Sequence, residues 1–459
     1  MKQAKKKLRL LPGLILVLVF VLSACGGNSN SSGKESSGTG EKSSGPVTIT
    51  YYTIDSPDRT YVEKLIPDFE SAHPNIKVKV EKAPYEQFDS KLQANIAAKN
   101  APDITSHFGY GGFAEYYNKD LLTDLTDIMN EDGFKPSDFG IQDELMDIYK
   151  VDGKTYGIPF SNYVTVLLYN KDMFDHAGLP YPPSDYEDKS WTFDKMVEVA
   201  DKLTVRDDDI EKSAYGVNFG WGELDMRPAY FGVKVYSDDT WTNGGKPSET
   251  HFDSPEAIDA YQQLIDLIWD KEVSPTPAWS KSVAGQFGDP FLSGKVGMTV
   301  GGSWSLASQD QFNFKIGVAA VPYGGNDEER SVLYVDPLFV LKDSKHPKEA
   351  YEFIKFLISK DVQEKSIELS GGTPPINDQA KDKYYNSFEG VDPEAIKNVY
   401  DGANKYGVES YNHLVANYSQ INELFINEFA AAENNTKPVP EVMQGIQKKL
   451  DKLLERVNK

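Results

Sequence analysis

Strand-like and helix-like segments alternate along the chain after its N-terminal region. Residues 47–52 are β-branched and aromatic, residues 61–72 carry apolar side chains at helical spacing, and residues 76–80 alternate strictly between apolar and polar. Helical spacing returns at residues 88–98, and a short strand is expected at residues 101–104. Repetition of strand, helix and strand predicts parallel sheets with helices on both faces.

The rest of the chain continues this alternation. Residues 164–169 read as a buried strand, Thr192 and Ser254 are expected to cap helices, and Asp336 interrupts an apolar run. The chain from His346 onward has mainly helical patterns. A body of about 410 residues exceeds what a single hydrophobic core usually supports. We therefore expect an α/β fold with two lobes, several chain passages between them and a cleft.

The first 25 residues have a different pattern, in which five basic residues precede an apolar run at residues 10–22. The run is too short for an ordinary transmembrane helix but typical of a secretory signal peptide. Small residues then precede Cys25, the only cysteine, in Leu22-Ser23-Ala24-Cys25-Gly26. This stretch resembles the lipobox of bacterial lipoproteins. A signal anchor, or a cysteine placed there by chance, is the less favoured alternative.

The lipobox resemblance implies a mature protein held on the outer face of the cell membrane. Residues 1–24 would be a signal peptide, and lipid, palmitate included, would be attached to Cys25. Residues 25–45 are rich in Gly and Ser and cannot bury apolar area, so they are expected to form a flexible tether. A single cysteine also excludes an internal disulfide framework.

The charge of the chain disfavours nucleic acid as a partner. Removing the five positive charges of the signal takes the formal net charge from −22 to −27. Phosphates require Lys and Arg to displace their counterions, and anionic lipid surfaces also attract basic residues. The acidic composition is better explained as the surface that keeps an extracellular protein soluble.

A search for catalytic motifs predicts no enzyme, cofactor or metal. The six histidines form no His-x-x-x-His pair, and no Gly-x-Ser-x-Gly, P-loop or dinucleotide motif occurs. The acidic run at residues 207–209 lacks the spacing of a calcium loop, so a solvated turn is favoured over a calcium site. A polysaccharide hydrolase remains the alternative, because two carboxylates need only meet in space.

Several segments resemble the bacterial extracellular solute-binding proteins of family 1, the sugar-capturing lipoproteins of ABC importers. They include Gly157-Ile158-Pro159-Phe160, residues 168–174, 177–179, Trp191-Thr192-Phe193-Asp194, residues 291–298, Gly301-Gly302-Ser303-Trp304, residues 348–350, 353–357 and Gly372-Thr373-Pro374. The resemblance implies a periplasmic-binding-protein-like fold whose lobes close over an unaltered ligand. The implied partners are a carbohydrate and the permease subunits of an ABC transporter, with the binding protein itself expected to be a monomer.

Analogy with this family also locates the passages between the lobes. They are expected near Asn162 to Thr165, near Leu333 and near Ile376. The N-terminal lobe would then comprise residues 46–163 with 334–376, and the C-terminal lobe residues 164–333 with 377–459.

The candidate ligand-binding residues are aromatic and polar side chains in loops that follow strands. A sugar has apolar faces that stack on aromatic rings and hydroxyls that need polar partners, since an unpaired group in a closed cleft costs about 1–3 kcal/mol. The candidates are Asp55, Tyr110, Asn162, Tyr163, Trp221, Trp304 and Asp336.

A structural role is the alternative for some of these candidates. Asp55 is as well placed to cap a helix as to bind a hydroxyl, and Trp304, which matches the aromatic platform of the family, could be a core residue. Tyr163 stands where the maltose binder has a carboxylate, which argues against a maltose-like hydroxyl pattern. Trp241, Trp269 and Trp279 read as core or surface residues. An oligosaccharide is the expected ligand, with another polar solute as the alternative.

Overall fold

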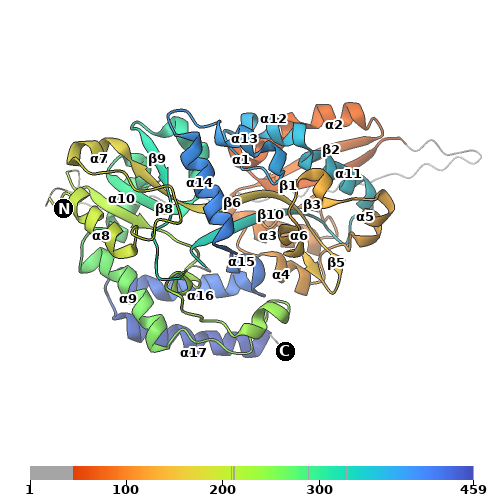
Figure 1. The fold of residues 1–459 in the computed structure, drawn as a ribbon. Helices are drawn as coiled ribbons and strands as arrows, with labels where there is room; N and C mark the ends of the chain where they lie inside the picture. The colour runs from red at the N-terminus through yellow and green to blue at the C-terminus, as the bar shows by residue number, and fades with distance from the viewer. Residues whose placement is uncertain (1–44, 208, 210–211, 288, 327–328, 458–459) are drawn as a thin grey trace, which may run out of the picture. The chain divides into compact units, whose positions relative to one another are not determined.

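A computed structural model describes residues 45–457 except 208, 210–211, 288 and 327–328 (Figure 1). The expected signal peptide, Cys25 and nearly all of the tether lie outside the described residues. Within the described residues, no helix combines the length and apolar character needed to cross a membrane.

The described strands form one mixed sheet and a small hairpin. The sheet has the order β2-β1-β3-β10-β6-β8-β7, with β11 beside β10 and β9 beside β6. Its strands are β1 (Val47–Ile54), β2 (Ile76–Ala83), β3 (Ile104–Thr105), β6 (Ile158–Asn170), β7 (Tyr215–Phe219), β8 (Val296–Gly302), β9 (Ile316–Ala319), β10 (Ser331–Val340) and β11 (Gly407–Glu409). The hairpin joins β4 (Lys150–Val151) and β5 (Lys154–Thr155).

The prediction of parallel sheets is wrong for part of the sheet. β1 pairs in parallel with β2 and β3, but β10 runs antiparallel to both β3 and β6. β6 also runs antiparallel to β8 and β9. Local hydrophobic patterns identify strands but carry no information on which strands become neighbours, so the long strands β6 and β10 could not be oriented in advance.

β6 is the strand that connects the two halves of the sheet. Its residues from Ile158 to Val164 pair with β10, whereas those from Thr165 to Tyr169 pair with β8. In Figure 1, β6 and β10 lie at the centre, with β1, β2 and β3 on one side and β8 and β9 on the other. The α/β chain thus forms two lobes that meet at these long strands.

Helices cover the sheet and make up most of the C-terminal part of the chain (Figure 1). They are α1 (Pro57–Thr60), α2 (Ile66–Ala72), α3 (Phe88–Ala97), α4 (Phe113–Asn118), α5 (Thr126–Asp132), α6 (Asp143–Asp147), α7 (Lys171–Ala177), α8 (Phe193–Leu203), α9 (Pro255–Trp269), α10 (Pro277–Phe287), α11 (Pro347–Ile358), α12 (Lys360–Ser370), α13 (Lys381–Tyr385), α14 (Pro393–Lys405), α15 (Tyr411–Leu414), α16 (Tyr418–Glu433) and α17 (Val439–Val457).

Helix boundaries follow the cap and proline chemistry of the sequence. The hydroxyl of Thr192 accepts the N–H of Lys195 at 3.1 Å, and that of Ser254 accepts the N–H of Ala257 at 3.2 Å, so both predicted caps are confirmed. The helix expected over residues 61–72 is instead a 3-10 turn followed by α2. Pro67 near the start of α2 has no N–H to donate to the preceding turn, which explains the break.

A bulge in β10 shapes the middle of the molecule. The pairing of β10 with β6 shifts register between Asp336 and Pro337. Proline cannot donate a ladder hydrogen bond and is tolerated in sheets at bulges, where the strand bends and a side chain is redirected. The register shift therefore occurs at Asp336, the residue that interrupts the apolar run of the sequence.

Candidate functional site

A cavity of about 510 Å³ lies beside the centre of β6 and β10. Segments far apart in the sequence form its walls: the ends of β1 and β3, the two central strands, the 3-10 helix η7 (Ser303–Gln311) and α15. Its lining residues are Ile54, Ser56, Arg59, Tyr85, His107, Phe108, Gly109, Tyr163, Glu223, Trp304, Ala307, Ser308, Gln311, Tyr334, Asp336, Ser370, Asn412 and His413.

Trp304 provides an aromatic surface in this cavity. It follows β8 directly, and its side chain is 44% exposed. A Cβ at Gly302 would lie 2.1 Å from Cη2 and Cζ3 of the indole, so only glycine at that position lets the ring lie over the strand end. The edge-to-face contacts with Tyr334 (5.0 Å) and Tyr163 (6.1 Å) hold the ring in place.

A buried ion pair forms one part of the cavity floor. Nη2 of Arg59 lies 2.6 Å from Oδ2 of Asp336, which also accepts the hydroxyl of Ser161 at 3.0 Å. Nη1 of Arg59 donates to the hydroxyl of Tyr163 at 2.6 Å, and the guanidinium lies over the rings of Tyr163 and Phe108. These contacts compensate the desolvation of both charges and fix their positions.

Two stacked histidines form the neighbouring part of the floor. The rings of His107 and His413 lie 3.6 Å apart at an angle of 18°, and Nε2 of His107 is 3.8 Å from Oδ1 of Asp336. Burial lowers the pKa of His413 to about 4 and lowers the pKa of His107 well below its usual range. Both imidazoles are therefore neutral at pH 7, and a neutral ring can both donate to and accept from a hydroxyl.

Two glutamates adjoin the histidines, the buried Glu409 and the half-buried Glu223. Glu409 contacts Nδ1 of His413 and accepts the N–H of Val335 at 3.2 Å, and burial raises its pKa well above the usual range. Glu223 lines the cavity and accepts the hydroxyl of Ser410 at 2.6 Å, and burial raises its pKa as well. The cavity thus places several polar side chains, some of them buried, around one space.

His107, Asp336 and His413 also offer three metal-ligating atoms within 4.8 Å of one another. Their arrangement does not favour a cation. The two imidazole rings are nearly parallel, so their lone pairs do not converge on one point, and the guanidinium of Arg59 already neutralises Asp336. Hydroxyl groups of a polar ligand suit these side chains better than a metal ion does.

Three of the seven candidate residues line the cavity, namely Tyr163, Trp304 and Asp336. Two more lie at its edge. Tyr110 is 38% exposed and packs edge-to-face at 5.4 Å against Tyr85, a lining residue. The carboxylate of Asp55 is exposed, between the lining residues Ile54 and Ser56, and lies 3.7 Å from Nζ of Lys82.

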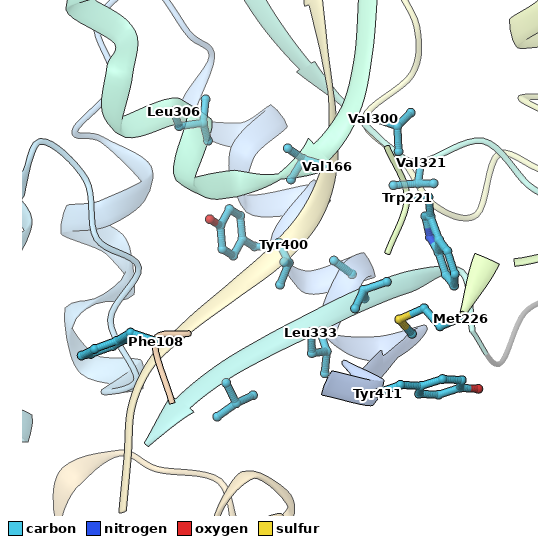
Figure 2. Close-up of a cluster of buried hydrophobic side chains, with 14 of the residues drawn as sticks. Phe108, Val166, Trp221, Met226, Val300, Leu306, Val321, Leu333, Tyr400 and Tyr411 are labelled. Carbon is cyan, nitrogen blue, oxygen red and sulfur yellow. The ribbon is translucent and has the colours of Figure 1, made fainter. Parts of the chain in front are cut away.

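The positions of Trp221 and Asn162 require a correction. Trp221 is completely buried, and its indole N–H donates to the carbonyl of Arg330 at 3.2 Å. Figure 2 draws it within the cluster of buried side chains that includes Met226. The amide of Asn162 donates to Asn404 at 2.7 Å instead of facing the cavity. Neither residue belongs to the cavity lining, so a stacking role for Trp221 does not fit the structure.

Four polar residues that line the cavity are not among the candidates predicted from the sequence, namely Arg59, His107, Glu223 and His413. Arg59 follows Asp55 by four residues, and His107 lies in the same glycine-rich loop as Tyr110. Both are therefore close in the sequence to a predicted ligand-binding residue. Glu223 is two residues from the candidate Trp221 in the same glycine-rich segment. His413 carries no local signal, because its partners His107 and Asp336 are distant in the chain.

A match to a known family accounts for this architecture. Residues 54–364 match the family described as bacterial extracellular solute-binding protein. The chain belongs to this family. The family resemblance predicted from the sequence is therefore confirmed, and the family consists of proteins that bind solutes instead of converting them.

Curated relatives of this solute-binding protein cover most of its length. The multiple sugar-binding protein of Streptococcus mutans is 23% identical over 82% of this chain and 84% of its own. The maltodextrin-binding protein of Bacillus subtilis is 26% identical over 68% of this chain and 67% of its own. A putative binding protein of Brucella abortus is 25% identical over 74% of this chain and 79% of its own.

Solved structures show the same two-lobed fold. An ABC substrate-binding protein of Listeria monocytogenes in complex with cycloalternan has a TM-score of 0.76, at 26% identity over 89% of this chain and 99% of its own. A maltose-bound protein of T. maritima has a TM-score of 0.67 at 21% identity, covering 89% of this chain and 100% of its own. The predicted α/β, two-lobed periplasmic-binding-protein-like fold is confirmed.

Proposed function

We propose that this protein captures an oligosaccharide in the 510 Å³ cavity and delivers it unchanged to the permease of an ABC importer. The observation that carries the proposal is that the exposed indole of Trp304 and the buried pair of Arg59 and Asp336 line the same cavity. A flat aromatic surface suits the apolar face of a pyranose, and the charged and neutral polar groups of the floor suit its hydroxyls.

The polar floor gives the cavity its selectivity for hydroxyl-bearing ligands. Asp336, Glu223 and the two neutral histidines are all positioned before a ligand arrives. Preorganised partners lower the entropy lost on binding, and an analogue without the matching hydroxyls would leave them unpaired. Carbohydrate-binding relatives, such as those named for multiple sugars and maltodextrin, support the same ligand class.

Closure of the two lobes would enclose the ligand. With lobes of residues 46–163 plus 334–376 and 164–333 plus 377–459, His107 and Asp336 come from one lobe, and Glu223, Trp304 and His413 from the other. A ligand that contacts both groups stabilises the closed state by its differential affinity for it. The closed protein, acting as a monomer, is then the form that the permease subunits accept.

A thermal-shift screen against mono- and oligosaccharides tests the proposal. A ligand at 100 times its dissociation constant adds about 2.7 kcal/mol of apparent stability. We expect an oligosaccharide to raise the melting temperature and to be recovered unchanged. A shift produced only by a non-carbohydrate solute would contradict the sugar assignment, and release of shorter sugars from a polysaccharide would indicate a hydrolase.

We also propose that lipid on Cys25 anchors the mature protein to the outer face of the cell membrane. The support is the lipobox-like sequence at residues 22–26 and the Gly- and Ser-rich stretch that follows it. A Cys25→Ala variant should bind the same sugar but leave the membrane fraction. Retention of this variant in the membrane would contradict the anchor.

A further inference from the structure

A second cavity of about 270 Å³ adjoins the first one at Trp304. Trp304 and Ser308 line both cavities, so the two spaces meet at η7. The main cavity continues from there toward Asp336 and the histidines, whereas the side cavity extends over β8 toward Phe291 and Phe312. A molecule lying along the exposed indole can therefore contact both.

The side cavity exists because β8 carries a glycine where it faces this space. Leu168 of β6 pairs in register with Thr299 of β8, and both residues line the cavity together with Gly301. Thr299 and Gly301 share one face of the strand because side chains alternate. A Cβ at Gly301 would meet no atom within 4 Å, so the position is open space.

The walls of the side cavity have the mixed chemistry that suits a sugar. Phe312 packs edge-to-face at 5.7 Å against the buried Phe291. The carboxylate of Asp289 accepts the backbone N–H of Phe291 at 2.7 Å, which fixes its position at the cavity. The hydroxyls of Ser305 and Ser308 add further polar groups. An aromatic wall with a carboxylate and hydroxyls repeats, on a smaller scale, the composition of the main cavity.

We propose that the side cavity binds an additional unit of the same carbohydrate, so that the ligand is a chain that crosses Trp304 from one cavity to the other. This inference rests on the proposed function and adds the determinant of ligand length. Gly301 is the specificity-determining position, because a large side chain such as leucine there would occupy the space of the additional unit, whereas a single methyl group meets no atom within 4 Å.

The test is isothermal titration of the full mature protein with two series of linear sugars, malto-oligosaccharides and manno-oligosaccharides, each from one to five units. In one series we expect the affinity to rise about tenfold at the unit that reaches the side cavity, as one hydrogen bond and one apolar contact are added. Filling the cavity with Gly301→Leu should abolish this increment and leave the affinity for shorter sugars unchanged.

Two variants control the experiment. Gly301→Ala adds a single methyl group to the open position and should keep the increment. Gly445→Leu adds the same leucine to open space in α17, away from both cavities, and should behave like the unmodified protein.

The outcomes separate this inference from the proposed function. An increment that survives in Gly301→Leu, or an affinity independent of chain length, would overturn the side-cavity site while the sugar-binding function stands. Failure of the unmodified protein to bind either series would overturn both.

Discussion

Trp304 follows Gly301-Gly302-Ser303, and Trp221 lies between two glycines, but the two side chains have opposite surroundings. Trp304 is 44% exposed, and its indole forms a wall shared by two cavities. Trp221 is fully buried, with its N–H bonded to the carbonyl of Arg330 and its ring tilted against Tyr230 at 5.4 Å. The difference shows that glycines nearby in the sequence do not decide whether a tryptophan is exposed or buried.

The comparison extends to the polar groups around each ring. Trp304 touches Tyr163, whose hydroxyl accepts a hydrogen bond from the buried Arg59. This network faces a cavity and can be completed by a ligand. The single polar atom of Trp221 is already satisfied inside the protein. In the proposed function Trp304 contributes to recognition, whereas the buried Trp221 contributes to stability, and substitutions can separate the two roles.

The largest expected effect is on stability, from Trp221→Ala. Truncating a fully buried tryptophan removes its packing and leaves a cavity, so we expect a loss of about 3–5 kcal/mol in the free energy of unfolding. Urea denaturation measures this loss, and titration below the transition should give the sugar affinity of the unmodified protein. A large drop in affinity with unchanged stability would reverse the assignment of the two tryptophans.

Asp336→Asn should come next, because it leaves the charge of Arg59 buried without its carboxylate partner. We expect a loss of about 3 kcal/mol in stability and weaker sugar binding. The double variant Arg59→Met/Asp336→Leu removes both charges and should recover much of the stability but none of the affinity. Recovery of affinity in that variant would show that the ion pair has no part in recognition.

Trp304→Ala should weaken sugar binding by about a hundredfold, or about 2.7 kcal/mol, as expected for a central aromatic contact. Because Trp304 is 44% exposed and its truncation opens no enclosed cavity in the core, the melting temperature should change little. Calorimetric titration with the preferred oligosaccharide provides the measurement. Unchanged affinity would exclude Trp304 from the site.

The smallest expected effect is the change in protein stability with pH that arises from His413 and Glu409. Burial lowers the pKa of His413 from 6.5 to about 4, so its contribution to stability is complete above pH 6.5 and is lost as the pH falls toward 4. Glu409 has the opposite effect on stability, because its pKa is raised. Its contribution to the free energy of unfolding is lost as the pH rises through this raised pKa.

Linkage for His413 alone predicts a loss of about 1 kcal/mol between pH 7 and pH 5.5. Urea denaturation over this range should show a steeper decline for the unmodified protein than for His413→Gln. Equal slopes would mean that His413 is not held neutral by its buried position.

The fold and the position of Trp304 at the cavity could be predicted from the sequence, whereas the pairing of the polar residues that line the cavity could not. The alternation at residues 76–80 and the caps at Thr192 and Ser254 are local signals, and the structure contains the elements they predict. Trp304 carries a local signal too. The pairs Arg59–Asp336 and His107–His413 join distant positions, and no pattern within one segment can specify them. Trp221 was misplaced for the same reason, since its neighbours come from other segments.

The most direct test of the account is intrinsic fluorescence during titration with the preferred oligosaccharide, in the unmodified protein, Trp221→Phe and Trp304→Phe. If the sugar stacks on Trp304, saturation should change the tryptophan emission in the first two proteins and leave it almost unchanged in Trp304→Phe. An emission change that persists in Trp304→Phe and disappears in Trp221→Phe would contradict the account.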